Sequence, residues 1–180
     1  ILITENRIEF VNKINNLLLS EKNNLPSLRV NLSGGMSENF NKMTALKLEE
    51  GFANELYSFR EIDKKTGRTN SNAISSDFTI YHNCNKLYDK DCSTGEQKIM
   101  LVSIVMAFIK LLQREGEKNI IFLLDDIFST LDSNFIDILL LALKDLNIQT
   151  WITDVSSCVI NKKHKIFEDT MFINIEDINI

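Results

Sequence analysis

Apolar residues recur at helical spacing in two stretches near the start of the chain. The spacing predicts helices over residues 4–22 and 37–59, with Thr4 as the N-cap of the first. Between them, residues 28–32 alternate between apolar and polar side chains, as in a short strand. Two helices joined by a short connection predict a helical arm subdomain, part of which residues 1–59 would form.

The rest of the chain alternates between strand-like and helix-like patterns. Two strongly apolar helices are predicted over residues 96–114 and 133–146. The predicted strands are short and cover residues 78–82, 86–88, 120–124, 150–153 and 171–175. This order predicts an α/β fold in which helices cross over between the strands of a sheet. We expect residues 60–180 to form this second unit.

A polar segment over residues 60–70 marks the predicted boundary between the two units. It contains a local basic cluster formed by Arg60, Lys64, Lys65 and Arg68. A solvated loop explains such a segment, and a loop that contacts phosphates is the functional alternative.

Composition narrows the classes of function. The formal net charge is −5, which argues against a self-sufficient nucleic-acid binder but allows a basic patch on one face. The three cysteines and two histidines show no metal-ligand spacing, so free thiols in a reducing cytosol are the simpler interpretation. No apolar run is long enough to cross a bilayer, so we expect no membrane partner.

The first candidate motif is Ser-Thr-Gly-Glu-Gln-Lys over residues 93–98, at the start of an apolar helix. Ser93 followed by Glu96 predicts a capping box, which would explain the motif structurally. In a functional interpretation, the helix N-terminus attracts a phosphate, Ser93 adds a hydroxyl donor, and Gly95 lets the backbone approach closely.

The second motif is the run Ile-Ile-Phe-Leu-Leu-Asp-Asp over residues 120–126. A buried strand that ends in two acids is costly unless the acids face a cation or water. In a phosphate-transfer site Asp125 would hold Mg²⁺, and Asp126 would orient or activate the attacking water. The same pattern also arises by chance.

The third motif, Ser-Thr-Leu-Asp over residues 129–132, lies just before the second apolar helix. Asp132 or Ser133 would cap that helix. The functional alternative is a loop that crosses a dimer interface. If the three motifs had met by chance in a generic α/β domain, Ser93 and the acid pair would lie at opposite ends of the fold.

The order of these motifs resembles the signature motif, Walker B and D-loop of ABC-type ATPases. In detail they resemble the RecF family of recombination mediators, relatives of the SMC and Rad50 ATPase heads. The similar residues are Ser-Thr-Gly-Glu-Gln-Lys at 93–98, Leu-Leu-Asp-Asp-Ile-Phe-Ser-Thr-Leu-Asp at 123–132, Gly-Arg-Thr at 67–69, Asp77, and Gln-Thr-Trp-Ile-Thr at 149–153. The resemblance covers most of the chain and is most specific over residues 60–156.

The resemblance implies part of a P-loop NTPase head of ABC type, with residues 60–180 as its C-terminal lobe. It implies a composite site in which one subunit's signature motif faces ATP held by the other subunit. The residues expected to act on the nucleotide or across the dimer are Ser93, Gly95, Glu96 and Asp132. Asp125 would bind Mg²⁺, and Asp126, where many ABC proteins have Glu, would be the catalytic residue of a slow ATPase.

The resemblance also implies partners and a process. RecF-type proteins dimerise on ATP, bind single-stranded or gapped DNA, and work with recombination mediator proteins to load recombinase. This implies a cytoplasmic role in DNA repair, recombination, replication and the SOS response. The alternatives are an SMC- or Rad50-like head fragment, and a catalytically inactive remnant that acts only as an interaction domain.

The chain departs from this family at the phosphate-binding loop. No glycine begins the G-x-x-x-x-G-K-[ST] pattern, so the sequence lacks the backbone cradle and lysine for the β- and γ-phosphates. We therefore expect the Walker A lobe to be missing from this chain, and the chain alone to bind ATP weakly or not at all. We also expect the strands near Ile120 and Trp151 to expose an apolar surface where that lobe would pack.

Overall fold

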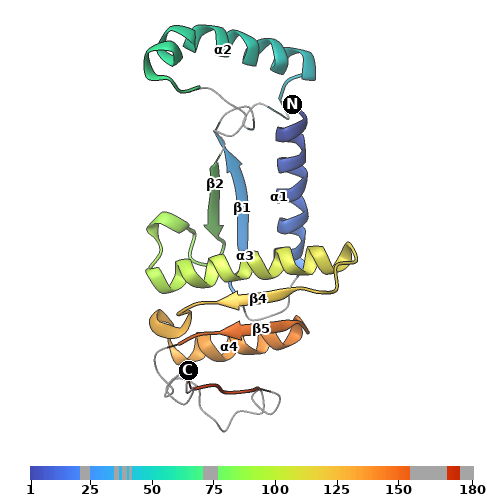
Figure 1. Cartoon of the computed structure of the whole chain (residues 1–180), viewed down its shortest axis with the longest axis vertical. Helices are drawn as coiled ribbons and strands as arrows, with labels where there is room; N and C mark the ends of the chain where they lie inside the picture. The colour runs from blue at the N-terminus through green and yellow to red at the C-terminus, as the bar shows by residue number, and fades with distance from the viewer. Residues whose placement is uncertain are drawn as a thin grey trace, which may run out of the picture.

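The computed structural model describes residues 1–20, 25–34, 37, 40, 42–70, 77–154 and 170–174. Its elements in chain order are α1 (Leu2–Ser20), β1 (Leu28–Ser33), α2 (Ala45–Thr66), β2 (Asp77–His82), β3 (Leu87–Tyr88), the 3-10 turn η2 (Asp89–Asp91), α3 (Thr94–Arg114), β4 (Ile121–Leu124), the 3-10 turn η3 (Phe128–Thr130), α4 (Ser133–Asp145) and β5 (Gln149–Ile152). They form an elongated molecule with α2 at one end and β4, β5 and α4 toward the other (Figure 1).

In the described part of the chain, the strands form two separate sheets. β1, β2 and β3 make an antiparallel sheet, whereas β4 and β5 make a parallel pair in which Leu123 lies beside Trp151. The prediction of a single crossover sheet from residue 78 onward is wrong for β2, which pairs with β1 in a separate sheet. It is confirmed for β4 and β5, which are parallel and joined through α4. The predicted strand over 171–175 is not formed at residues 171–174, and residue 175 lies outside the described part of the chain.

The main core lies between the β4–β5 sheet and the helices α3 and α4. Phe122 and Leu124 of β4 belong to this core, together with Met106 of α3 and Leu139 of α4, which are both 0% exposed. Both helices lie where their apolar spacing predicted them, and β4 lies within one residue of its predicted range. This core positions the loop that follows β4.

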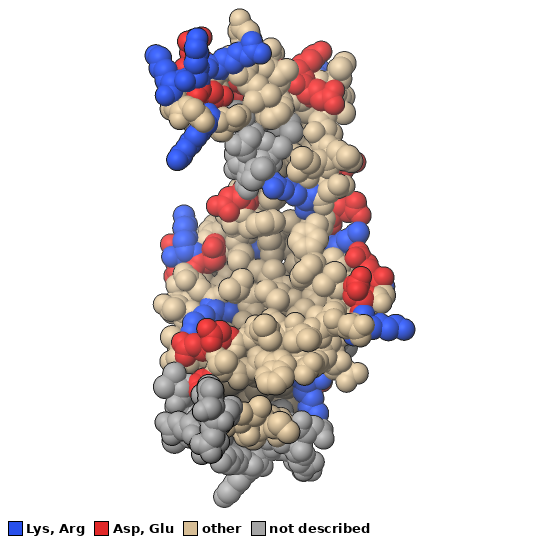
Figure 2. Space-filling view, viewed as in Figure 1, with Lys and Arg blue, Asp and Glu red and all other residues tan. Residues whose placement is uncertain are grey.

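The other face of the β4–β5 sheet is open. Ile121, Leu123 and Trp151 are 59%, 70% and 51% exposed. Figure 2 shows an area without charged side chains over β4 and β5. Parallel strands are normally covered on both faces. The prediction of an exposed apolar surface at these strands is confirmed.

The helix α1 runs along β1 and onto α3 (Figure 1). Its apolar face, which contacts Val30 and Ala107, consists of Val11, Ile14 and Leu17. The Asn15 amide donates to the Val30 carbonyl at 2.8 Å and accepts from the Val30 N–H at 2.8 Å. Because β1 is an edge strand, Asn15 satisfies backbone groups that its sheet leaves unpaired.

The start of α1 differs from the prediction. The helix begins at Leu2, so Thr4 lies inside it and is buried, 4% exposed, instead of serving as the N-cap. A residue type that favours caps can still lie within a helix where packing covers it.

The helix α2 stands apart from the other elements at one end of the molecule (Figure 1). Its 22 residues include a single buried one, Leu48. The predicted range of 37–59 is wrong at both ends, because the helix begins at Ala45 and continues to Thr66. Residues 60–66, predicted as a solvated loop, are therefore helical.

The end of α2 is set by Gly67. This residue has a left-handed φ of 67°, and its N–H donates to the Asp63 carbonyl at 2.8 Å. Position 59 lies inside the helix, and β1 of the first predicted unit pairs with β2 of the second. The division of the chain into units 1–59 and 60–180 stays a prediction.

Candidate functional site

The N-terminus of α3 is closed by the predicted capping box. The Ser93 N–H and hydroxyl each donate to Glu96 Oε2 at 2.8 Å, and the Glu96 N–H donates to Ser93 Oγ at 3.3 Å. The Asn85 amide donates to Glu96 Oε1 at 2.8 Å. The Ser93 hydroxyl, predicted as a phosphate donor, is thus held by Glu96 here.

Glu96 is stabilised in its charged form. The hydrogen bonds from the Ser93 backbone and then from its hydroxyl lower the pKa of the Glu96 carboxyl, and the nearby His82 lowers this pKa further. A carboxylate at this position also interacts favourably with the positive end of the helix dipole. The start of α3 therefore carries a negative charge of its own.

Gly95 lies against the loop that follows β4. A Cβ built on this glycine would lie 2.7 Å from the Thr130 carbonyl oxygen, and 3.9 Å from a methyl group of Leu131. Real Cβ atoms do not approach a backbone oxygen so closely, so the position requires glycine. The reason lies within this chain and is separate from the close phosphate approach predicted from the sequence.

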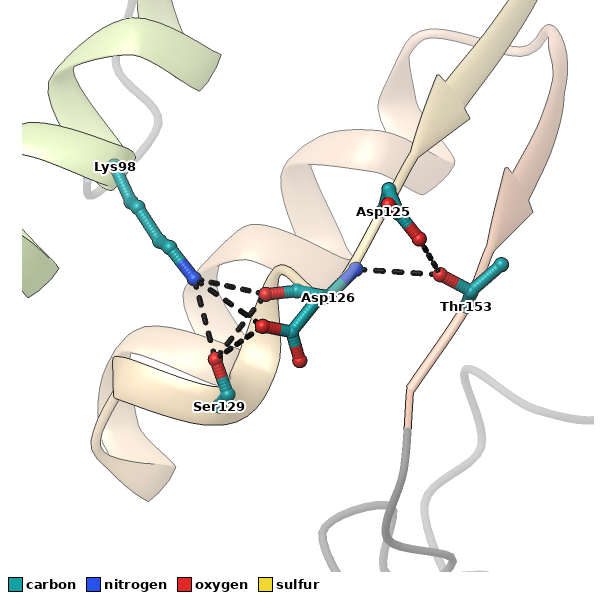
Figure 3. A network of polar contacts seen from close by, with 5 residues as sticks. All are labelled: Lys98, Asp125, Asp126, Ser129 and Thr153. Atoms are coloured by element: carbon teal, nitrogen blue, oxygen red, sulfur yellow. Dashed lines mark hydrogen bonds and ion pairs between the residues drawn. The ribbon is translucent and has the colours of Figure 1, made fainter.

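The acid pair follows β4 directly, and Thr153 joins its two members. The Thr153 hydroxyl donates to the Asp125 carboxylate and accepts from the Asp126 N–H at 3.2 Å (Figure 3). The Thr153 N–H donates to the Leu124 carbonyl at 2.9 Å. Because β4 and β5 are parallel neighbours, the residues after each strand meet at the same sheet edge.

Asp126 is held from its other side by Lys98 and Ser129. Lys98 Nζ donates to the Asp126 carbonyl at 2.8 Å and to Ser129 Oγ at 3.2 Å, and lies 3.9 Å from Asp126 Oδ2 (Figure 3). The Ser129 hydroxyl donates to Asp126 Oδ2 at 2.9 Å. Asp126 has a left-handed φ of 47°, which is uncommon for a residue other than glycine.

The third motif ends in a helix cap. Asp132 Oδ1 accepts from the Phe135 N–H at 2.9 Å, so Asp132 rather than Ser133 is the N-cap of α4. This structural interpretation is confirmed. The role of Asp132 across a dimer stays a prediction.

The fold brings the three motifs together. The start of α3 touches the loop after β4 through Gly95 and Lys98, so Ser93 and the acid pair lie on the same side of the molecule. The arrangement expected for motifs that met by chance is contradicted.

The sequence patterns predicted no role for three residues of the site, although they lie within the motifs that resemble RecF: Lys98, Ser129 and Thr153. A lysine three positions after Gly95, hence on the same helix face, was the available signal.

The acid pair fits a magnesium ion only together with outside ligands. Among the residues that the structure describes, no three Asp, Glu, His or Cys side chains gather around a common metal position. Magnesium in nucleotide sites is commonly held by one or two carboxylates, with waters and phosphates completing the shell. The Asp125 carboxylate fits that arrangement, whereas the sequence has no glycine-rich loop that fits the triphosphate itself.

Sequence similarity decides the family. The chain is 32% identical to the DNA replication and repair protein RecF of Rickettsia prowazekii (strain Madrid E) over 155 residues, which cover 84% of this chain and 42% of that protein. The chain belongs to the RecF family. RecF of Rickettsia rickettsii (strain Sheila Smith) is 38% identical over 99 residues, or 55% of this chain and 28% of that protein. The chain thus spans less than half the length of these RecF relatives.

A solved RecF structure supports the fold. The structure of the recombination mediator protein RecF-ATPrS in the RecFOR pathway matches with a TM-score of 0.56 and 21% sequence identity, over 85% of this chain and 40% of that chain. The α/β architecture is therefore that of part of RecF. No protein-family model matches the chain. None of the helices in the described residues is both long and apolar enough to cross a membrane.

Proposed function

We propose that this chain is the part of a RecF-type DNA repair ATPase that carries the signature motif, Walker B and D-loop. The observation that carries the proposal is the contact between the start of α3 and the loop after β4. Lys98, five residues after Ser93, reaches the backbone of Asp126 at 2.8 Å. The similarity to RecF proteins of two Rickettsia species supports this proposal.

In this proposal the two acids have different roles, one in metal binding and one in orienting water. Asp125, oriented by the Thr153 hydroxyl, holds Mg²⁺, which would neutralise phosphate charge when bound. Asp126 accepts a hydrogen bond from the attacking water and so orients it. Its side chain is one methylene shorter than the Glu of many ABC proteins, which supports slow hydrolysis and a switch-like role.

The signature residues act on ATP that is held by a second subunit. The N-terminus of α3, with Ser93 and Gly95, would face the γ-phosphate of that nucleotide. Since the Ser93 hydroxyl donates to Glu96 at 2.8 Å, it must turn away from Glu96 before it donates to a phosphate. Asp132 then lies at the subunit boundary of an ATP-dependent homodimer.

The Walker A loop would be supplied by a lobe outside these 180 residues. The open face of the β4–β5 sheet, which contains Ile121, Leu123 and Trp151, is the apolar surface that such a lobe would cover. The chain alone would then bind ATP weakly or not at all. Micromolar ATP affinity of the isolated chain would contradict this part of the proposal.

Turnover by the native polypeptide tests the enzymatic role. We expect Mg²⁺-dependent ATP hydrolysis that falls at least about a hundredfold in Asp125→Asn, because the metal loses its charged ligand. The matched control is Asp145→Asn, at the last residue of α4 and away from the site. Equal activity of wild type and Asp125→Asn would favour the alternative of an inactive remnant that acts only in protein interactions.

DNA contact is proposed for the free end of α2. Arg60, Lys64, Lys65 and Arg68 are all exposed there, and Figure 2 shows Lys and Arg side chains gathered at this end of the molecule. Replacing these four residues by Gln should weaken binding to single-stranded or gapped DNA. The slope of log affinity against log salt should fall by about 0.7–0.9 for each phosphate that is no longer neutralised. The exposed Lys118→Gln is the control.

The wider role follows from the same family membership. We propose that the whole protein works with recombination mediator partners to load recombinase on damaged DNA, in the cytoplasm and during the SOS response. Immunoprecipitation of the native polypeptide before and after DNA damage, with mediator proteins as the readout, tests this role. Equal recovery of mediator proteins from cells that lack the native polypeptide would contradict this role.

A further inference from the structure

We propose that Lys98 is a positioning residue that fixes Asp126 to the start of α3. The position of the acid pair then depends on the position of α3. The inference rests on the proposed ATPase function for its catalytic consequence. Its structural part concerns contacts within this chain and stands apart from that function.

The ammonium group of Lys98 contacts Asp126 and Ser129 in a small polar network (Figure 3). It donates to the Asp126 carbonyl at 2.8 Å and to Ser129 Oγ at 3.2 Å, and lies 3.9 Å from the Asp126 carboxylate. Ser129 in turn donates to that carboxylate at 2.9 Å. Lys98 therefore contacts the backbone of Asp126 and also Ser129, which donates to the Asp126 carboxylate.

The backbone contact matters more than the ion pair. The side chains of Lys98 and Asp126 are 29% and 53% exposed, and an ion pair between such groups contributes little. The hydrogen bond to the Asp126 carbonyl is different, because it restrains a residue with a left-handed φ of 47°. Left-handed backbone at a non-glycine residue persists when surrounding contacts hold it.

A second contact between the same two elements supports this link. Gly95 lies three residues before Lys98, on the same face of α3, and fits against the Thr130 carbonyl so closely that a Cβ would lie 2.7 Å from it. The start of α3 thus contacts the loop 125–132 at two places, at Asp126 through Lys98 and at Thr130 through Gly95. A shift of this helix cannot leave the loop in place unless both contacts break.

Thr153 holds the opposite side of the acid pair. Thr153 directly follows β5, and its hydroxyl accepts a hydrogen bond from the Asp126 N–H at 3.2 Å. Asp126 is therefore held on one side by Thr153, which follows β5 of the packed sheet, and on the other side by Lys98 of α3. If α3 moves when its N-terminus meets a phosphate, Lys98 is the contact that carries the movement to Asp126.

Hydrogen exchange of the native polypeptide without nucleotide tests the structural part. We expect Lys98→Met to speed amide exchange over residues 126–131 about tenfold, because a charged hydrogen bond to the loop is removed. Exchange in α4 should not change. Lys98→Arg, which keeps a charged donor, should restore protection, and Lys118→Met should resemble wild type. Unchanged exchange over 126–131 in Lys98→Met would overturn the proposal.

ATP turnover by the same variants tests the catalytic part. Lys98→Met should lower kcat about ten- to a hundredfold with little change in KM, since a misplaced Asp126 affects the chemical step rather than nucleotide binding. Lys98→Arg should recover part of kcat. A loss that appears only in KM, or only as a lower melting temperature, would overturn the positioning role.

The two experiments separate two kinds of failure. If the wild-type polypeptide hydrolyses no ATP, the proposed function fails, and the exchange data alone decide whether Lys98 positions the loop. If wild type hydrolyses ATP and Lys98→Met does so equally well, the proposed function stands and the effect of Lys98 on catalysis is refuted.

Discussion

The helices α4 and α2 both carry apolar residues at helical spacing, but their surroundings differ. Of its 13 residues, α4 buries Ile136, Leu139, Leu140, Ala142 and Leu143. Of its 22 residues, α2 buries only Leu48, and it leaves Leu46, Tyr57 and Ile62 exposed. In Figure 1, α4 lies against β5, whereas α2 stands apart. The difference shows that an apolar stripe gives a helix a face to bury, while the tertiary structure decides whether anything covers it.

The largest expected contrast between the two helices is in core packing. Leu139→Ala should lower the free energy of unfolding by about 3 kcal/mol, because Leu139 is fully buried and its truncation leaves a cavity. Phe52→Ala in α2, where the ring is only partly buried, should cost less than about 1 kcal/mol. Urea denaturation followed by circular dichroism measures both values. Equal losses would mean that α2 is packed as firmly as α4.

The two helical glycines should respond in opposite directions. Gly95→Ala should lower the free energy of unfolding by about 2 kcal/mol, since the new Cβ would overlap the Thr130 carbonyl. The Cβ added by Gly51→Ala meets no atom within 4 Å beyond the adjoining turns of α2, and the substitution should raise this free energy by about 0.7 kcal/mol through better helix propensity. Thermal melting of the two variants gives the signs. Stabilisation by Gly95→Ala would show that α3 and the loop are not in contact.

The helix caps provide a smaller contrast. Asp132→Ala should cost about 1 kcal/mol of unfolding free energy, because the Phe135 N–H loses its acceptor at the start of α4. Thr44, at the N-cap position of α2, makes no side-chain cap hydrogen bond, so Thr44→Ala should change stability by less than about 0.5 kcal/mol. A larger loss in Thr44→Ala, measured by the same urea titration, would contradict this ranking.

The smallest effect concerns the charge of Glu96. Because its pKa is lowered in the folded state, the stability that the charged form adds is complete above the ordinary Glu pKa of about 4.3. This stability is lost as the pH falls through the lowered value. At neutral pH, Glu96→Gln should be less stable than wild type by about 0.5 kcal/mol, the usual size of a charge effect at a helix end.

The pH series supplies the control for this last prediction. The difference in unfolding free energy between wild type and Glu96→Gln should shrink as the pH is lowered below the lowered pKa, where both side chains are neutral. A difference that stays constant with pH would mean that the Glu96 charge adds no stability.

Local patterns predicted those parts of the site that depend on neighbours in sequence. The capping box of Ser93 with Glu96, and the cap formed by Asp132, both join residues three apart, so their spacing already specifies the contact. The basic segment 60–66 was misjudged for a local reason as well. Its polar residues suggested a loop, although Lys, Arg and Glu are good helix formers, and the helix ends only at Gly67.

Contacts between distant residues could not be predicted in the same way. Lys98 and Asp126, like Asp125 and Thr153, lie 28 residues apart, and no spacing rule pairs them. The strand pattern at residues 78–82 likewise identified β2, but not its pairing with the distant β1. Alternating side chains show that a strand has a buried face, and they do not specify which strand lies beside it.

The sequence by itself determined the main elements of the site, their caps and the family, because the motifs and helix signals are local. The tertiary structure decided which face of the β4–β5 sheet is covered, that α2 stands apart, and that Lys98 meets Asp126. These features depend on the packing of segments that are far apart in the chain. Packing is a property of their joint arrangement in space, which the residues of any one segment do not specify.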